Sequence, residues 1–358
     1  MKMLHLEDNR AERQRAYVET EDGKFRYQVL LDYAKGLPEN MKYVPVMGTV
    51  AGGRCDNDDN LLVGLRGGSF MSPEPLPCLI KLDSEGNFIE NLGVGVLKGM
   101  HFFNVTKENT IIMPVGNSLV EYSMDFKTVI KKYEGTKKSN NTDPELHKYV
   151  QMHRGIFPTE PFIGETFHHD PYIWMMKRKT MKFDGPFHNP TNAAQDSKGN
   201  YYVSDGYNNV AVHKFDKDMN LVATWGGHGV FDWYTDTPGK FLVVHSLAVD
   251  PNDNIWVCDR EKDAVHVFDK NGNVVFYASH NMAQPSGIDC DDKYMYVVGR
   301  GGYLTIFDFD FNLVGQLGYF NGNLRGHDCA VDSKGNVYLF PTHANEEHQV
   351  IALKRIYE

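Results

Sequence analysis

Residues 241–273 read FLVVHSLAVDPNDNIWVCDREKDAVHVFDKNGN, and this stretch decides the fold. Its apolar runs are separated by two copies of the pattern Asp-x-x-x-Asn, at Asp250–Asn254 and Asp269–Asn273. Asp, Asn and Gly provide the hydrogen bonds and the positive φ angles that a tight hairpin needs. The stretch therefore predicts short antiparallel strands joined by tight turns.

The same turn pattern recurs along the chain, with Gly at its fourth position in half of the copies. Its eight copies are Asp56–Asn60, Asp83–Asn87, Asp196–Asn200, Asp216–Asn220, Asp250–Asn254, Asp269–Asn273, Asp308–Asn312 and Asp332–Asn336. Frequent Gly (33 residues) and an aromatic content of 12% also favour strands and turns over helices. The chain of 358 residues is therefore expected to be all-β.

Superimposing the turns aligns six repeats over one column of residues. The column holds Ala51, His101, Thr191, His245, Ser286 and His327. The last three are 41 residues apart, which is the length of a four-stranded propeller blade. Six such units predict a six-bladed β-propeller. The 90-residue separation of His101 and Thr191 indicates an insertion at about 136–182.

The ends of the chain suggest how the ring closes. The last blade ends at about residues 349–356 with only three strands, and the alternating stretch Phe25–Tyr33 supplies a fourth. We therefore expect residues 1–24 to form an N-terminal arm and residues 25–358 to form the propeller. The insertion contains Asp143-Pro144, a typical helix start, so it is expected to be partly helical. Two roles are compatible with the insertion: it forms a wall of the substrate site, or it forms a contact between subunits.

Composition narrows the class of partner. The net charge of -10, without a Lys/Arg stripe, argues against nucleic acid. No 18-residue apolar run is present, so no membrane span is expected, and Met1–Tyr17 lacks the apolar core of a secretory signal. Three of the five Cys fall in inner-strand patterns, where a reduced, buried thiol is expected. These features predict a cytoplasmic protein.

Three His of the column, His101, His245 and His327, occupy alternate repeats. A ring of six repeats brings the residues at alternate positions together around its axis. An isolated His, by contrast, more often has a structural role. Three convergent imidazoles suit a metal ion, usually zinc, with an open fourth position.

Cationic and phenolic side chains are expected at the next loops. Aligned strand ends carry Arg66, Arg260 and Arg300, and the equivalent loop of the third repeat carries Tyr207. Arg beside a metal implies an anionic ligand, and a Tyr there would have a lowered pKa suited to a base. Packing between blades is the alternative role for these Arg and for Tyr207.

Asp328 directly follows His327. Adjacent residues of a strand point to opposite faces, so Asp328 is a candidate ligand for a second, oxygen-ligated ion on the axis, for which Ca²⁺ is the candidate. A surface or turn position is the alternative.

Several stretches resemble NHL-type propellers and, more narrowly, the peptidyl-α-hydroxyglycine α-amidating lyases. The stretches are VSDGYNN (203–209), GKFLVVHSLAVD (239–250), VCDREKDAVHVF (257–268) and GHDCAVD (326–332). That family cleaves a carbinolamide into an amide and glyoxylate. The resemblance covers roughly residues 48–130 and 183–345.

The resemblance implies roles for individual residues. It implies zinc on His101, His245 and His327, a catalytic Tyr207, and substrate-site Arg66 and Arg260. It also implies structural calcium on Asp328 and on the carbonyls of Gly53 and Phe103. The family's Met-Pro before the last His is Arg325-Gly326 here, which adds a cation beside the substrate, and its Cys after the Tyr is Asn208. The family's disulfides, signal peptide and hydroxylating domain have no counterpart.

The sequence thus predicts a zinc-dependent lyase that cleaves a C–N or C–O bond in a small hydroxylated, anionic substrate. Arg325 and Arg300 are further candidates for substrate binding. A hydrolase or hydratase that uses zinc-bound water is the first alternative, and a non-enzymatic NHL scaffold for a protein partner is the second. Calcium-dependent lactonase chemistry is disfavoured by the three His. The substrate and the oligomeric state remain open.

Overall fold

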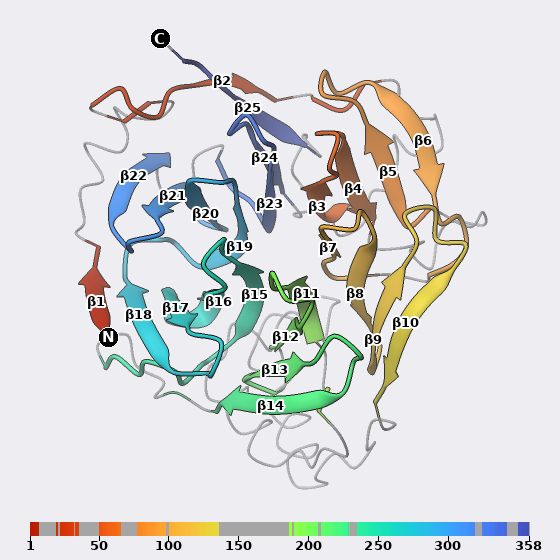
Figure 1. The fold of residues 1–358 in the computed structure, drawn as a ribbon. Helices are drawn as coiled ribbons and strands as arrows, with labels where there is room; N and C mark the ends of the chain where they lie inside the picture. Colours follow the sequence, from red (N-terminus) through yellow and green to blue (C-terminus); the bar gives the residue numbers. More distant parts are fainter. Residues whose placement is uncertain are drawn as a thin grey trace, which may run out of the picture.

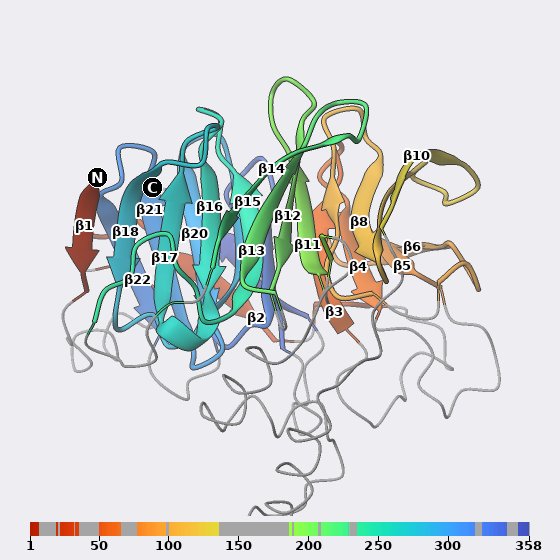
Figure 2. The same cartoon turned by 90° about the horizontal axis from the view of Figure 1, so that it is seen from below.

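The computed structural model describes residues 1–6, 19–20, 22–31, 33–35, 50–65, 77–97, 100–135, 186–187, 190–206, 209–227, 229, 235–318, 324–341 and 350–357. In these ranges, six sheets are arranged as blades around one axis, which confirms the all-β six-bladed propeller (Figure 1). Figure 2 shows the blades side-on, with the strands packed next to one another around the ring. The insertion at 136–182 lies outside the described residues, so its predicted helix is not addressed by the structure.

Blades 1 to 3 are antiparallel sheets whose strands follow chain order. Blade 1 contains β3 (Val50–Cys55), β4 (Leu61–Leu65), β5 (Leu79–Leu82) and β6 (Phe88–Leu92). Blade 2 contains β7 (Asn104–Val105), β8 (Ile111–Val115), β9 (Ser118–Tyr122) and β10 (Val129–Glu134). Blade 3 contains β11 (Pro190–Gln195), β12 (Tyr201–Asp205), β13 (Ala211–Phe215) and β14 (Leu221–Gly226).

Blades 4 to 6 repeat this plan and add the N-terminal segments. Blade 4 contains β15 (Val244–Val249), β16 (Ile255–Asp259), β17 (Ala264–Phe268) and β18 (Val274–Ser279), with β1 (Lys2–His5) beside β18. Blade 5 contains β19 (Pro285–Cys290), β20 (Tyr294–Gly299), β21 (Tyr303–Asp308) and β22 (Leu313–Gly318). Blade 6 contains β23 (Asp328–Val331), β24 (Val337–Phe340), β25 (Ile351–Arg355) and β2 (Tyr27–Leu30).

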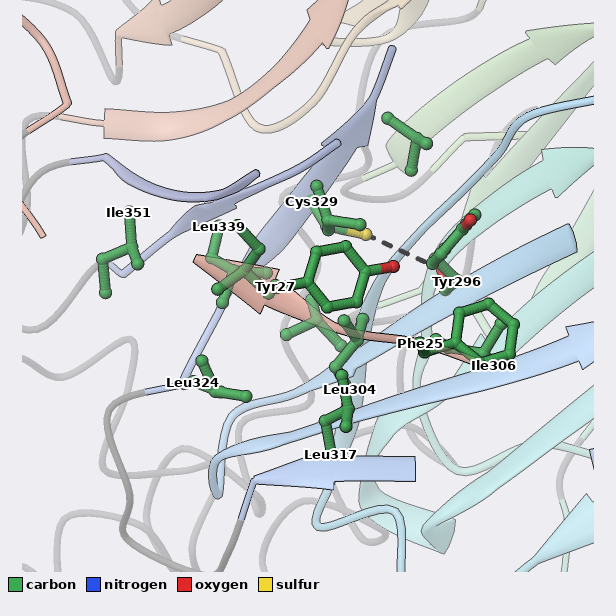
Figure 3. Close-up of a cluster of buried hydrophobic side chains, with 14 residues drawn as sticks. Phe25, Tyr27, Tyr296, Leu304, Ile306, Leu317, Leu324, Cys329, Leu339 and Ile351 are labelled. Carbon is green, nitrogen blue, oxygen red and sulfur yellow. Dashed lines mark hydrogen bonds between the residues drawn. The ribbon is translucent and has the colours of Figure 1, made fainter. Parts of the chain in front are cut away.

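The N-terminal strand closes the ring as predicted. β2 pairs antiparallel with β25, although it is shorter than the stretch 25–33 that the sequence indicated. Phe25 and Tyr27 lie in an apolar cluster with residues of blades 5 and 6, including Tyr296, Leu304 and Leu339 (Figure 3). Closure therefore joins the two ends of the chain by backbone pairing and by a shared core.

The extreme N-terminus departs from the expected arm. β1 adds to blade 4 as a fifth strand, parallel to β18, and Leu6 after it is buried. Sequence patterning gave no signal for this pairing, since four residues of mixed polarity match no strand template. Of residues 7–24, most lie outside the described ranges.

All eight Asp-x-x-x-Asn turns have the same hydrogen bonds. In each, the Asp carboxylate accepts from the backbone N–H two and four residues later and from the Asn side chain, as Asp250 does. The fourth turn residue has a positive φ in every copy. Gly fills four of these positions, and Asp59, Met219, Asp253 and Phe311 fill the others.

The innermost strands of blades 1, 3, 4 and 5 carry a β-bulge at the residue column. The register shifts between Val50 and Gly52, and between Val244 and Ser246, so that Ala51 and His245 have no residue opposite them. The same shift occurs at Thr191 and Ser286. A bulge re-aims side chains relative to strict alternation. Column residues and the residues that follow them can therefore both face the axis.

All five Cys are free thiols in the structure, and Cys78, Cys258 and Cys329 are buried. Among the described residues, no helix has the length and hydropathy to cross a bilayer.

Candidate metal centre on the propeller axis

The structure brings His101, His245 and His327 together on the axis. The three ring centroids lie 4.9 to 5.0 Å from one another. One nitrogen of each ring lies within 4.8 Å of the corresponding nitrogens of the other two. His245 belongs to β15, His327 directly precedes β23, and His101 lies three residues before β7. The inner part of the ring thus presents three imidazole donors to one point, as a catalytic zinc site requires.

Backbone carbonyls of neighbouring blades orient two of these rings. His245 Nδ1 donates to the carbonyl oxygen of Ser286 at 2.7 Å, and His327 Nδ1 donates to that of Ala51 at 2.9 Å. Both acceptors belong to the same residue column, one blade further on. A proton on Nδ1 places the lone pair of each ring on Nε2, so these rings are oriented as metal ligands are. The sequence did not identify these acceptors, because any residue type carries a carbonyl.

Phe102 packs against all three imidazoles. Its ring centroid lies 4.2 Å from that of His101, 4.8 Å from His327 and 5.4 Å from His245. The side chain is fully buried. It therefore forms an apolar wall of the centre that sequence reasoning missed, although Phe102 directly follows the first ligand.

Burial and neighbouring positive charge favour the neutral form of His245. Burial lowers the pKa of His245 well below its usual value, and the charges of Arg260, His327 and His101 lower it further. A deprotonated imidazole is the form that binds a metal. The donor set therefore fits a zinc ion.

Arg260 lies near the centre, because its backbone N–H donates to the carbonyl of Val243, two residues before His245, at 3.1 Å. It begins the short 3-10 helix η2 (Arg260–Lys262) and is 2% exposed. Its Nε donates to Glu261 at 2.8 Å, and Glu261 also accepts from Gln284 at 3.2 Å. The backbone of Gln284 in turn accepts from the Arg300 N–H at 3.1 Å. Hydrogen bonds through Gln284 thus join the loop that carries Arg260 to the loop that carries Arg300.

The other predicted substrate-site residues are only partly described. Arg325 is half-buried and lies two residues before His327. Arg66 and Tyr207 lie outside the described residues. The loop that contains Tyr207 nevertheless starts at Gly206, where an added Cβ would lie 1.7 Å from the Val244 carbonyl oxygen. This glycine permits close contact with β15 one residue from His245.

A second buried centre lies on the axis around Asp328, and its cation is Arg54. The Arg54 Nη1 donates to Asp328 Oδ2 and to the carbonyl of Cys329, both at 2.8 Å, and also to the carbonyl of Gly53. Its Nε donates to the Asn104 side chain at 2.9 Å, and its Nη2 to the carbonyl of Ile288 at 3.2 Å. Arg54 is 2% exposed and therefore joins blades 1, 2, 5 and 6 inside the ring.

These residues do not fit a calcium ion. Two of the three expected calcium ligands, Asp328 and the Gly53 carbonyl, are hydrogen-bonded to the Arg54 guanidinium. Burial alone would lower the pKa of Arg54, but the charges of Asp328 and Asp289 outweigh it and raise that pKa, so Arg54 stays charged. The third expected ligand is the carbonyl of Phe103, whose side chain packs in the core of blades 1 and 2. The sequence predicted that Asp328 lies on the axis, but Arg54 was not predicted to be the cation beside it.

Comparisons with known proteins agree with the repeats and the fold. No family model matches the chain. The chain is 27% identical over 184 residues to Peptidyl-glycine alpha-amidating monooxygenase A of Xenopus laevis, covering 44% of this chain and 18% of that protein. It is 36% identical over 83 residues to Probable peptidyl-alpha-hydroxyglycine alpha-amidating lyase pgal-1 of Caenorhabditis elegans, covering 23% of each. It is 29% identical over 119 residues to NHL repeat-containing protein 3 of Homo sapiens, covering 31% of this chain and 32% of that protein.

Solved propellers share the fold at low identity. A streptogramin B lyase has a TM-score of 0.51 and 9% identity, with 92% of this chain and 98% of that chain covered. A catalytically inactive virginiamycin B lyase from Staphylococcus aureus, solved with quinupristin, has a TM-score of 0.52 and 9% identity, with 92% and 100% covered. Such identities establish the fold alone.

The chain is therefore a six-bladed propeller distantly similar to NHL repeat proteins. Within that class, its sequence similarity extends to the peptidylglycine-amidating enzymes and the amidating lyases. The matched segments span about a third or less of these relatives' own length.

Proposed function

We propose that this protein is a zinc-dependent lyase of the amidating-lyase type, acting on a small hydroxylated, anionic substrate at the propeller axis. The observation that supports this most is the set of three imidazoles, His101, His245 and His327, two of which are oriented by backbone carbonyls. The similarity to amidating lyases supports the same reaction class.

The residues around the three imidazoles have distinct roles in this proposal. A zinc ion held there supplies Lewis-acid polarisation of a substrate hydroxyl. Arg260 and Arg66 bind the anionic end of the substrate, and Arg325 and Arg300 add positive charge. Tyr207 accepts the proton of the substrate hydroxyl as the C–N or C–O bond breaks. The electron pair of the breaking bond leaves with the nitrogen or oxygen, and the hydroxyl carbon becomes a carbonyl. Phe102 excludes water from one side.

We propose a cytoplasmic location, supported by the five free thiols, and no nucleic-acid partner, supported by the net charge of -10. Calcium has no part in the proposal, because Arg54 supplies the positive charge beside Asp328.

An N-acyl-α-hydroxyglycine tests the reaction directly. Zinc-loaded protein is incubated with N-benzoyl-α-hydroxyglycine in H₂¹⁸O, and the products are analysed by mass spectrometry immediately. A lyase releases benzamide and glyoxylate, and His245→Ala abolishes the release. Production of benzoic acid labelled with ¹⁸O would instead identify a hydrolase.

A hydrolase or hydratase remains the second candidate, because three imidazoles with an open fourth position also activate water. A non-enzymatic scaffold is favoured only by the similarity to NHL repeat-containing protein 3. It predicts a protein without a stoichiometric metal, whose cellular role survives His245→Ala.

A further inference from the structure

A second group of metal-binding side chains lies at the outer rim of blade 4. The group, which we term the rim cluster, consists of His5, Asp236 and His280, whose donor atoms lie within 4.8 Å of one another. His5 Nε2 lies 2.7 Å from Asp236 Oδ2. The rings of His5 and His280 are 4.9 Å apart and nearly perpendicular, at 83°. This spacing equals that of the imidazoles on the axis.

Backbone pairing brings these residues together from three segments. His5 ends β1 and pairs in register with Ser279, the residue before His280. The Leu6 N–H donates to the Ser279 carbonyl at 2.9 Å, and the Asn281 side chain donates to the Leu6 carbonyl at 2.7 Å. The strand and the following residue are therefore fixed on both sides of His5. Figure 1 shows β1 beside β18 at the edge of the ring, away from the axis.

The donors suit a first-row divalent cation. Tetrahedral zinc holds ligand atoms about 3.3 Å apart, which is longer than the 2.7 Å between His5 and Asp236 and shorter than the 4.8 Å that bounds the rim cluster. Ser279 Oγ donates to the other oxygen of Asp236 at 3.3 Å, which orients the carboxylate as partners of metal ligands do. The exposed side of His5 leaves access for a metal ion and a water ligand. We propose that the rim cluster binds zinc or a similar divalent transition metal and thereby fastens β1 to blade 4.

An ion pair between His5 and Asp236 does not account for the third residue. His280 offers a further donor atom within 4.8 Å of the other two, and two imidazoles and one carboxylate together can share a divalent cation.

Metal titration of the full-length protein tests the rim cluster independently of the axis. Metal-free wild type, His5→Ala, His280→Ala and His245→Ala are titrated with Co²⁺ and Zn²⁺, and bound metal is counted by absorption and calorimetry. Lys2→Ala is the matched control, because it removes a contact of β1 to Asn312 without removing a ligand. Hydrogen exchange of β1 amides is measured with and without Zn²⁺.

The expected result is one equivalent of metal that His5→Ala and His280→Ala abolish and that Lys2→Ala and His245→Ala retain. Zinc should slow exchange in β1 at least tenfold in the wild type and leave it unchanged in His280→Ala. Loss of an equivalent in His245→Ala alone would support only the axial site and overturn the rim cluster. Equal metal binding by wild type and His280→Ala, with unchanged exchange, would show an ion pair only.

Discussion

Two buried centres share the propeller axis, and they differ in where their positive charge comes from. Around Asp328, the chain supplies its own cation, since Arg54 is hydrogen-bonded to Asp328 and to the carbonyls of Gly53 and Cys329. Around His245, three imidazoles face one another with their Nδ1 atoms committed, in two cases, to carbonyls. We propose that the imidazole level receives its cation from outside, whereas Arg54 already supplies the positive charge beside Asp328.

Adjacent residues of blade 6 contribute to the two levels. His327 meets the other imidazoles, and Asp328 lies against Gly52 and Gly287 of the neighbouring blades 1 and 5. Strict alternation along a strand would turn one of two adjacent side chains away. In blades 1, 3, 4 and 5, a bulge at the column re-aims side chains relative to this alternation.

The largest expected effect is at the imidazole level. His245→Ala should abolish binding of the axial metal and lower the rate of the proposed reaction by at least about 10³-fold, since a metal supplies several kcal/mol of charge stabilisation. Elemental analysis and the product assay measure both. The contradicting result is a His245→Ala protein that is folded, still binds metal on the axis and is still active. Such a protein would show that the two levels do not differ in the way described.

Arg54→Met should destabilise the protein by about 3–5 kcal/mol, because it leaves Asp328 buried without its cation. Urea denaturation measures this, and the double variant Arg54→Met with Asp328→Asn should recover much of the loss. The wild type should be insensitive to a calcium chelator. A wild type that loses stability on chelation of calcium, with Arg54→Met unaffected, contradicts the assignment of Arg54 as the internal cation.

Gly52→Ala tests the closeness of the packing around Asp328. A Cβ at this position would lie 2.2 Å from Asp328 Oδ2, so the carboxylate has to move away from Arg54. Overpacking of this kind costs about 1–3 kcal/mol. The free energy of unfolding should fall by that amount while metal binding at the three imidazoles is retained. Loss of metal with unchanged stability would mean that the two levels are one site.

Arg325→Gln should have the smallest effect, on the substrate alone. Arg325 is half-buried, so removing its charge should weaken binding of an anionic substrate by about 1 kcal/mol, or about fivefold in KM. Steady-state kinetics measure the change, with kcat and metal content as internal controls. A fall in kcat at constant KM would assign Arg325 to the chemical step instead.

Repetition explains how much of the molecule the sequence predicted. The turn pattern and the residue column led to six blades, to convergence of His101, His245 and His327, and to ring closure by a strand near the N-terminus. All three depend on residue types at fixed spacings, which a sequence displays directly. The proposed roles of Arg66 and Tyr207 remain predictions.

Features that depend on backbone or on distant neighbours were not predicted. The acceptors for His245 and His327 are the backbone carbonyls of Ser286 and Ala51, and residue type does not indicate a backbone acceptor. The parallel pairing of Lys2 with Phe276 joins residues far apart in the chain. Arg54 occupies the repeat position that holds Asn104 and Asp289 in other blades, a signal that was available in the aligned repeats but was overlooked.

Anomalous diffraction at the zinc absorption edge, from crystals of the zinc-loaded protein, tests the central claim most directly. The account predicts a peak on the axis about 2.0–2.1 Å from a nitrogen of His101, His245 and His327, and no metal between Arg54 and Asp328. Zinc-soaked crystals without a peak among the three imidazoles would contradict it.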